Sequence, residues 1–364
     1  MEKAYKYRIY PNRTQEQLIQ KTFGCCRFVY NHFLNTKIEA YKSEKKNLSY
    51  NNLSERLTKL KKGAEWLREP DKCSLQNSLK DLTAAYERFF KLHSGYPKFK
   101  SKKNRHKSYR TNFSNNNIQF CGKHIKLPKL GFVKIRDKQI PQGRILNATI
   151  SQVPSGKYYV SLCCTDVEIE KYSPTHKKVG IDLGIKDFAI TSDGVRYENP
   201  KHLTKSLNKL AKLQRELSRK TRNSSNWNKA RIKVARLHEH ISNQRNDYLN
   251  KLSTELVSKY DTICIEDLSV KDMMKNHKLA RSIADVSWYE FTRKLTYKAD
   301  WYGKSLVKIN QYYPSSQTCH CCGYRTAKTK DLSVRSWMCP YCRSVLDRDV
   351  NAAINILNEG LKIA

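Results

Sequence analysis

A short apolar segment near the middle of the chain, VGIDLG at residues 179–184, places one carboxylate between two glycines. Successive side chains of a β-strand point to opposite faces, so Asp182 shares a face with Gly180 and Gly184. Taken alone, the segment would fit a strand-end aspartate beside a tight turn. Because glycine weakens a strand, we expect a further reason for the pair: a bare face that a metal ion or a nucleic-acid backbone can approach.

The charge of the chain favours a polyanionic partner. Lysine and arginine number 70 against 33 acidic residues, which gives a formal net charge of +37. Cations that neutralise phosphates release counterions, and the 22 tyrosines add rings that can stack on unpaired bases. We expect no membrane partner, because the sequence contains neither a bilayer-spanning apolar run nor a secretory leader.

The length of 364 residues predicts two or three domains. Residues 4–10 alternate in the manner of a strand, and residues 11–95 are predicted to form a helical unit. Within that unit, a capping box at residues 14–17, with Thr14 as the cap, opens a long helix. Further helices are expected at about 49–62 and 71–93, and their apolar stripes are interpreted as core.

Short strands follow a basic and aromatic stretch. They are expected at 125–127, 132–135, 148–153 and 158–164. Together with residues 4–10, these strands would close a small barrel into which the helical unit is inserted. In the stretch before them, basic residues alternate with Tyr96, Phe99 and Tyr109, which favours a nucleic-acid groove over a merely solvated face.

A linker at residues 174–178 precedes the Asp182 strand, and a helical hairpin follows that strand. Leucine and isoleucine at helical spacing mark its two arms, over residues 203–217 and 232–252. The exposed faces of the arms are dense in lysine and arginine and have few acidic partners. We expect a nucleic-acid duplex to lie against this surface, the alternative being that the charges only keep the hairpin soluble.

Two further acids stand at the ends of predicted elements, as Asp182 does. Glu266 closes the apolar strand at residues 262–266, and Asp349 precedes a short C-terminal helix. Three carboxylates from separate elements suit two magnesium ions, because hard cations take oxygen ligands that carboxylates can share. Such a metal pair acts on the attacking and leaving oxygens of a phosphodiester. Each acid alone would be interpreted as structural, but together, in a chain of this charge, they indicate a nuclease.

Two C-x2-C pairs predict a structural zinc site. Cys319 and Cys322 form the first pair, and Cys339 and Cys342 form the second. Four thiolates leave no open coordination position, so this zinc is expected to fold a ribbon rather than to react. Cys321 lies out of register with the first pair and is not expected to be a ligand.

Seven segments of the chain closely resemble the TnpB family, the OrfB-type transposon-encoded RNA-guided nucleases related to type V CRISPR effectors. They are YKYRIYPN at 5–12, GYPKFK at 95–100, GIDLG at 180–184, IEDL at 265–268, SSQTC at 315–319, CPYC at 339–342 and DRDVNAA at 347–353. The resemblance therefore extends over nearly the whole chain.

The resemblance implies a multidomain fold that mixes α+β and α/β parts. A RuvC-like nuclease domain of RNase H fold would be interrupted by the zinc ribbon, and an N-terminal wedge β-barrel would carry a helical recognition insert. The implied ranges are 1–10 and 96–173 for the wedge, 11–95 for the recognition domain, 174–314 and 344–364 for the nuclease domain, and 315–343 for the ribbon, which would bind target nucleic acid.

The resemblance also implies an RNA-guided endonuclease that cuts double-stranded DNA. A guide RNA derived from the transposon end would pair with a target beside a short transposon-adjacent motif. Asp182, Glu266 and Asp349 match the catalytic residues of the family and would hold two Mg²⁺ ions, or Mn²⁺ in their place, with Asp347 as the fallback for the third acid. The implied protein is a monomeric ribonucleoprotein of the prokaryotic cytoplasm, associated with the nucleoid.

Contacts to the motif duplex are implied for polar residues one helical turn apart and for lysines in the basic stretch. The residue types are suitable, because glutamine reads adenine edges while tyrosine and serine position phosphates. Ordinary exposed helix residues are the alternative interpretation. The candidates are Tyr50, Ser54, Lys72, Gln76, Lys98 and Lys100.

Two other functions fit the same scaffold. A nuclease-inactive RNA-guided DNA-binding repressor would not need three metal-binding acids. A guide-independent RuvC-like junction resolvase would not need the long basic N-terminal half. A transposase is a weaker interpretation, because strand transfer by the related elements requires a tyrosine nucleophile that this pattern does not supply.

Overall fold

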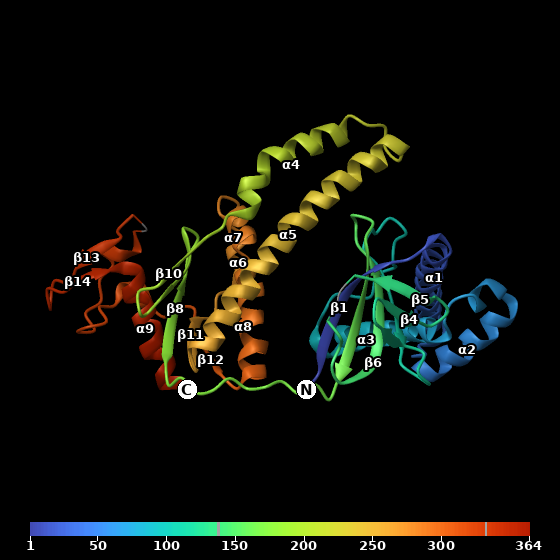
Figure 1. Cartoon of the computed structure of the whole chain (residues 1–364), viewed down its shortest axis with the longest axis horizontal. Helices are drawn as coiled ribbons and strands as arrows, with labels where there is room; N and C mark the ends of the chain where they lie inside the picture. The colour runs from blue at the N-terminus through green and yellow to red at the C-terminus, as the bar shows by residue number, and fades with distance from the viewer. Residues whose placement is uncertain (137–138, 332) are drawn as a thin grey trace. The chain divides into compact units, whose positions relative to one another are not determined.

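The computed structural model describes residues 1–136, 139–331 and 333–364. The chain divides into two compact units, Met1–Glu168 and Ile169–Ala364, and each is described by itself (Figure 1). The predicted mixture of helices and strands is present in both units. Among the helices described, none is long and apolar enough to cross a bilayer.

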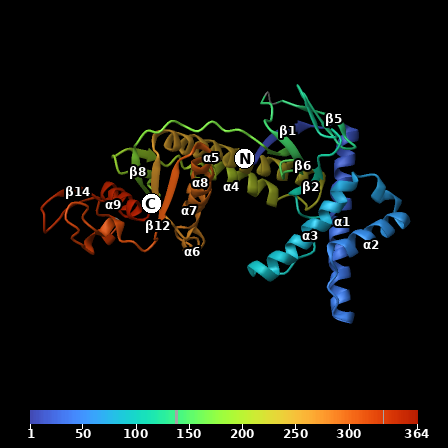
Figure 2. The same ribbon diagram turned by 90° about the horizontal axis from the view of Figure 1, so that it is seen from below.

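Three helices of the first unit confirm the sequence predictions. They are α1 (Arg13–Glu44), α2 (Tyr50–Gly63) and α3 (Lys72–Leu92), with a 3-10 turn, η1 (Glu65–Arg68), between the last two. Their axes cross rather than run parallel (Figure 2). The predicted cap of α1 is wrong: Asn12, rather than Thr14, closes the capping box, with Gln15 as its partner. Asparagine is the stronger N-cap of the two, so the helix begins two residues earlier.

Seven described strands of the first unit form one antiparallel sheet, in the order β2-β6-β7-β1-β5-β4-β3. They are β1 (Lys3–Tyr10), β2 (Lys107–Asn112), β3 (Gln119–Cys121), β4 (His124–Leu127), β5 (Gly131–Ile135), β6 (Arg144–Gln152) and β7 (Tyr158–Thr165). The sheet curls strongly. The rings of Tyr7 on β1 and Phe120 on β3 have centroids 5.3 Å apart, whereas three flat strand spacings would separate them by about 14 Å. Closure into a barrel stays a prediction.

Strands β2 and β3 were not predicted from the sequence. The basic residues on the exposed side of β2 hide its alternation, and the inward-facing Tyr109 is buried edge-on against Phe23 of α1. The predicted place of Tyr109 in a nucleic-acid groove is therefore wrong, because its ring belongs to the core. Tyr96 and Phe99 are 46% and 54% exposed, so the stretch before β2 keeps two accessible rings.

The second unit is built on a five-stranded sheet in the order β10-β9-β8-β11-β12. Its strands are β8 (Lys178–Leu183), β9 (Asp187–Thr191), β10 (Arg196–Glu198), β11 (Thr262–Glu266) and β12 (Ser305–Ile309). Strands β8, β11 and β12 run parallel, whereas β9 and β10 are antiparallel additions. As predicted, Val179 and Ile181 of β8 are buried on one face, where Leu183 packs beside them.

Helices cover both faces of this sheet (Figure 1). The helices described in this unit are α4 (His202–Ser218), α5 (Ser225–Lys259), α6 (Val270–Met273), α7 (Ala280–Val286), α8 (Trp288–Tyr302) and α9 (Arg348–Ile363), of which α5, α8 and α9 cover the sheet. One core joins the apolar face of β8 to α5 and α8 through Leu252 and Phe291. A second core joins Ile356 of α9 to Cys264 and Ile309 on the opposite face. The sheet is therefore enclosed between α5 and α8 on one side and α9 on the other.

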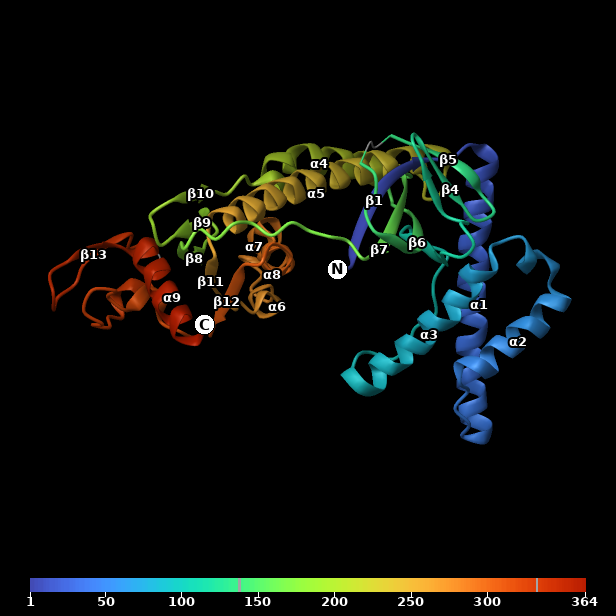
Figure 3. The ribbon, with the colours of Figure 1, turned by 60° about the horizontal axis from the view of Figure 1, so that its bottom comes forward.

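Helices α4 and α5 form the predicted hairpin and run side by side in Figures 1 and 3. Leu210 of α4 packs against Leu237 and Ile241 of α5. The C-terminal half of α5 continues into the sheet core, where Leu249 and Leu256 are buried. The hairpin is thus anchored at one end by the same helix that covers the sheet.

The segment between β12 and α9 carries the cysteine pairs. It contains two 3-10 turns, η2 (Ser315–Gln317) and η3 (Lys328–Lys330), and two short strands, β13 (Ser336–Met338) and β14 (Val345–Asp347). Strand β13 pairs antiparallel with β14, and β14 leads directly into α9. This insert is therefore joined covalently to the helix that carries Asp349.

Candidate active site

Parallel pairing of β8 with β11 brings two of the three predicted acids together. The register places Ile181 opposite Ile265, so Asp182 and Glu266, the next residue of each strand, stand side by side. Carboxyl ends of parallel strands meet at one edge of a sheet, which is where ligands bind in open α/β folds. The two carboxylates therefore share that edge.

Asp349 reaches the same edge because α9 lies unusually close to β8. A Cβ on Gly180 would sit 2.0 Å from the carbonyl oxygen of Ala353, and a Cβ on Gly360 would sit 2.4 Å from Cys264 Sγ. Only glycine permits such an approach. Helix α9 therefore covers the face of β8 at Gly180. The prediction that this face is open to a metal ion or a nucleic-acid backbone is wrong at Gly180.

Asp347 acts as the N-cap of α9. Its Oδ1 accepts hydrogen bonds from the backbone N–H groups of Asp349 at 3.1 Å and Val350 at 2.9 Å. Its Oδ2 pairs with Arg196 at 2.6 Å. We keep Asp349 rather than Asp347 as the third acid of the candidate site, because Asp349 is buried and its charge acts on Asp182, whereas the Asp347 side chain is 41% exposed.

Burial raises the pKa values of two acids at this edge, and like charges add to the shift of Asp182. Burial, followed by the charges of Glu266 and Asp349, raises the pKa of Asp182 to about 7, and the charge of Arg348 opposes that shift. Burial also raises the pKa of Glu266, while a hydrogen bond from Ser315 Oγ to Glu266 Oε1 at 2.6 Å lowers it. Buried carboxylates whose charges interact resist ionising together, and a divalent cation among them would remove that cost.

Two arginines hold Asp349, and neither was predicted from the sequence. Arg348 Nε and Nη2 donate to Asp349 Oδ1 at 3.1 and 2.9 Å, and Arg335 Nη1 donates to Oδ2 at 3.1 Å. The position of Arg348 between two acids in the motif was a usable signal. No sequence signal marked Arg335, because only the fold of the insert brings this residue to Asp349.

The donor set of the three acids suits a hard divalent cation such as Mg²⁺ or Mn²⁺. Their oxygens are nevertheless not gathered as tightly as the cysteine sulfurs. Across residues 1–136, 139–331 and 333–364, four cysteines are the only group of three or more Cys, His, Asp or Glu side chains whose ligand atoms lie close enough to share one ion. Asp349 faces the arginines and Glu266 faces Ser315.

The four predicted cysteines meet in one cluster. Cys319 Sγ lies 3.6 Å from Cys342 Sγ, and Cys322 Sγ lies 3.5 Å from Cys339 Sγ. Tetrahedral zinc with bonds of about 2.3 Å would place its sulfurs about 3.8 Å apart, so the cluster fits that ion. Hydrogen bonding with Ser344 lowers the pKa of Cys342 to about 6, which favours the thiolate that binds metal.

Two asparagines of α9 hydrogen-bond to the segment that leads into the first cysteine pair, Cys319 and Cys322. We call the turn that carries this pair the first cysteine knuckle. Asn355 Nδ2 donates to the carbonyl oxygens of Ser315 at 2.8 Å and Thr318 at 2.6 Å. Asn351 Nδ2 also donates to the Thr318 carbonyl, at 2.8 Å. Both asparagines are buried and stand one turn apart. The knuckle is thereby tied to the helix that carries the third acid.

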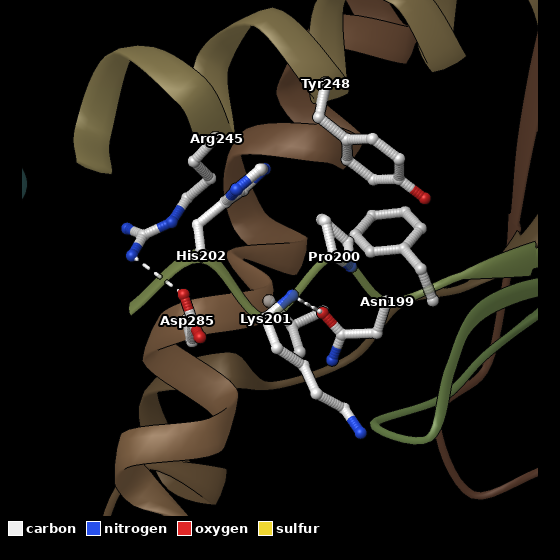
Figure 4. Close-up of a pocket in the computed structure, with 9 residues that line it drawn as sticks. Asn199, Pro200, Lys201, His202, Arg245, Tyr248 and Asp285 are labelled. Atoms are coloured by element: carbon white, nitrogen blue, oxygen red, sulfur yellow. Dashed lines mark hydrogen bonds and ion pairs between the residues drawn. The ribbon is translucent and has the colours of Figure 1, made fainter. Parts of the chain in front are cut away.

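A small pocket at the start of α4 anchors the hairpin. Asp285 of α7 accepts from the backbone N–H groups of Leu203 at 3.1 Å and Thr204 at 3.3 Å, which caps α4 from another helix. Arg245 of α5 pairs with the same carboxylate at 3.2 Å (Figure 4). His202 also lines this pocket, and burial lowers the pKa of its ring. Asp285 thus joins three helices at the base of the hairpin.

The predicted duplex contacts on the helices lie on α2 and α3, two helices linked by a contact between Lys80 and Tyr50. Tyr50 and Ser54 stand one turn apart on α2, and Lys72 and Gln76 are exposed on α3. Lys80, one turn beyond Gln76, places its Nζ 5.9 Å from the centroid of the Tyr50 ring. Lys80 was missed from the sequence, although its spacing from Gln76 was a signal. Contact of these residues with DNA stays a prediction.

The two predicted lysines of the basic stretch differ in how they are held. Lys98 is exposed. Lys100 places its Nζ 4.1 Å from the centroid of the Tyr30 ring on α1, and its backbone exchanges two hydrogen bonds with the side chain of Asn31. Lys100 is thus fixed on α1, which leaves Lys98 as the freer cation.

A mixed sheet with two acids at adjacent strand ends, followed by a four-cysteine insert before α9, defines a mixed α and β protein with a cysteine cluster that could hold zinc. Family models match three parts of this chain: a "Probable transposase" model (OrfB, IS605) at residues 161–277, a "Cas12f1-like, TNB domain" at 288–356 and a "Helix-turn-helix domain" at 1–46. In the last range the structure has β1 and one long helix, α1.

Full-length relatives agree with these matches. The chain is 41% identical to a "Putative RNA-guided DNA endonuclease" of Streptomyces pristinaespiralis, over 99% of this chain and 90% of the relative. It is 36% identical to the "Putative RNA-guided DNA endonuclease InsQ" of Escherichia coli (strain K12), over 98% and 92%. The chain belongs to the OrfB/TnpB family.

A solved structure shares the fold. The protein chain in the cryo-EM structure of a Cas12f1-sgRNA-target DNA complex superimposes with a TM-score of 0.60, over 98% of this chain and 99% of that chain, at 14% identity. The two chains therefore have a common mixed α and β architecture despite their divergent sequences.

Proposed function

We propose that this chain is an RNA-guided DNA endonuclease. Two relatives that span nearly its whole length carry that name. The observation that carries the proposal is the placement of Asp182 and Glu266 at adjacent strand ends, with Asp349 on the helix packed against that sheet. The net charge of +37 supports nucleic-acid partners.

In this proposal, Asp182, Glu266 and Asp349 hold two divalent cations, with Mg²⁺ as the expected ion and Mn²⁺ as its substitute. When bound, such cations stabilise the charge on the attacking and leaving oxygens of a phosphodiester. The residues of the chain supply position: β8 and β11 fix two acids, α9 fixes the third, and Ser315 orients Glu266 through its hydrogen bond. Asp182 serves as a ligand in its ionised form.

The domain ranges are part of the proposal. Residues 174–314 and 344–364 would form the RuvC-like nuclease domain, with 315–343 as the zinc ribbon. Residues 1–10 and 96–173 would form the wedge, which the curled sheet of the first unit supports, and 11–95 would form the recognition domain.

The partners would be a guide RNA from the transposon end and a duplex target beside a short motif. On the α2 and α3 surface, Lys72, Gln76 and Lys80 would contact the duplex. The exposed rings of Tyr96 and Phe99 would stack on unpaired bases. Guide pairing, rather than side chains, would read the target sequence.

Cleavage by the complex of the chain with its co-purified RNA tests the proposal. Sequencing that RNA defines the target, and a library of flanking sequences defines the motif. Asp182→Ala is expected to abolish Mg²⁺-dependent cleavage while RNA and target binding survive. Asp267→Ala is the matched control, because Asp267 is the exposed acid next to Glu266. Its ion pair with Lys308 lies at the protein surface. Cutting by Asp182→Ala would show that the site is wrong.

The same experiment separates the alternative functions. A parent complex that binds the RNA-matched duplex without cutting it, at any Mg²⁺ or Mn²⁺ concentration, would favour a nuclease-inactive repressor. A protein that carries no RNA and cuts four-way junctions would favour a junction resolvase.

A further inference from the structure

Both oxygens of Asp349 face guanidinium groups. Oδ1 accepts from Arg348 and Oδ2 accepts from Arg335. A carboxylate that serves as a metal ligand must direct an oxygen toward the cation, and a positive charge at that oxygen repels the cation. The contacts of Asp349 are therefore in competition with its proposed role.

The two arginines differ in how firmly they are held. Arg348 is buried at 7% exposure and also donates to the carbonyl oxygen of Asp331 at 3.2 Å. The Arg335 side chain is 46% exposed, and that of Asp349 is 11% exposed. The Arg335 guanidinium can leave at modest cost, because water solvates it and Arg348 still pairs with the buried Asp349. The contact that can exchange is the one between Arg335 and Asp349.

The backbone of Arg335 is fixed beside the site although its side chain is exposed. Its carbonyl oxygen accepts from the backbone N–H of Arg348 at 2.8 Å. The next residue, Ser336, pairs with Asp347 in the β13–β14 ladder. The guanidinium can therefore swing away from Asp349 and return, because its Cα stays next to the start of α9.

We propose that Arg335 is a positioning residue that holds Asp349 until a divalent cation displaces it. The proposal rests on the proposed metal site. It explains why the three acids do not share one point while the four cysteine sulfurs do. Because Arg335 belongs to the cysteine-bearing insert, that insert would control how readily the third acid becomes available to a cation.

Binding of Mn²⁺ to the full-length, zinc-loaded chain tests this proposal, with free Mn²⁺ measured by electron paramagnetic resonance. Arg335→Gln is expected to bind Mn²⁺ about two- to fivefold more tightly than the parent, since a competing charge is gone. Arg335→Glu should bind more tightly still. Arg335→Lys, which keeps the charge, should stay near the parent. Arg325→Gln removes another exposed arginine from the same insert and should change nothing.

A second comparison asks whether Arg335 acts through Asp349. In an Asp349→Asn background, Arg335→Gln should no longer alter Mn²⁺ affinity. The parent's Mn²⁺ binding is first shown to depend on Asp182. The proposal would then be overturned by equal Mn²⁺ affinities across the Arg335 variants, or by weaker binding in Arg335→Gln. Mn²⁺ binding that is independent of Asp182 would instead overturn the metal site itself. No RNA or DNA is present, so the result does not depend on guided cleavage.

Discussion

Gly180 of β8 and Ala353 of α9 are in backbone contact: a Cβ on Gly180 would lie 2.0 Å from the carbonyl oxygen of Ala353. A helix approaches a strand this closely only where the strand has no side chain. Asp182 follows Gly180 by two positions, and Asp349 precedes Ala353 by one helical turn. The same contact therefore sets how far apart these two acids stand.

Gly180→Ala should destabilise the second unit by about 1–3 kcal/mol or more, because the added methyl overpacks the contact with α9. The midpoint of chemical unfolding measures this loss. Gly24→Ala is the control: a Cβ there meets no atom within 4 Å, and alanine is the better helix former. A Gly180→Ala midpoint equal to that of the parent would contradict the close packing of α9.

Cys339→Ser should lose bound zinc, because a thiolate ligand is replaced by a weakly binding hydroxyl. We expect about one zinc ion per parent chain by elemental analysis. Cys321→Ser should keep its zinc, since Cys321 is exposed and stands outside the four-sulfur cluster. Full zinc content in Cys339→Ser would refute the assigned ligand set.

Asn355→Ala should loosen the first cysteine knuckle, because the carbonyl oxygen of Ser315 would lose its side-chain donor and that of Thr318 would keep only Asn351. An unsatisfied buried acceptor costs about 1–3 kcal/mol. The expected result is faster zinc loss to a chelator, followed with a chromogenic dye. Asn358→Ala, on the exposed side of α9, should release zinc at the parent rate. Equal rates for the two variants would argue against the asparagine clamp.

The raised pKa of Asp182 predicts opposite effects of pH on binding and stability. Mn²⁺ affinity should rise as pH increases through about 7, because the cation binds the ionised carboxylate. The folded state holds this proton more tightly than the unfolded state, so stability without added cation should fall between about pH 4 and 7. Titrations of unfolding midpoint against pH, with and without Mn²⁺, measure both. In Asp182→Asn the contribution of this group should vanish.

Local signals predicted most helices and strands of the first unit. Ser49 and Asp71 are the N-caps of α2 and α3, and their side chains accept backbone N–H groups three residues on. Strand β2 was missed because its inward residues, such as Tyr109, lie among lysine and arginine. Burial of Tyr109 depends on α1, which is distant in sequence, so no local pattern could separate a core ring from a surface ring.

For the candidate site, spacing was informative wherever the ligands are close in sequence. The four cysteines were found because a knuckle draws its ligands from adjacent positions. Asp182 was found because two glycines flank it on an apolar strand, and Glu266 because it ends an apolar run. Arg335, Ser315 and Asn355 were not found, since each has a partner that the chain reaches only through the folded insert.

The sequence by itself determined the residue types available for chemistry: the cysteine pairs, the strand-end acids and the excess of cations. These are local properties of composition and periodicity. Only the tertiary structure decided that Gly180 makes room for α9 rather than for a ligand, and that Arg335 pairs with Asp349. Both are contacts between segments far apart in the chain, whose geometry depends on the packing of the whole sheet and its insert.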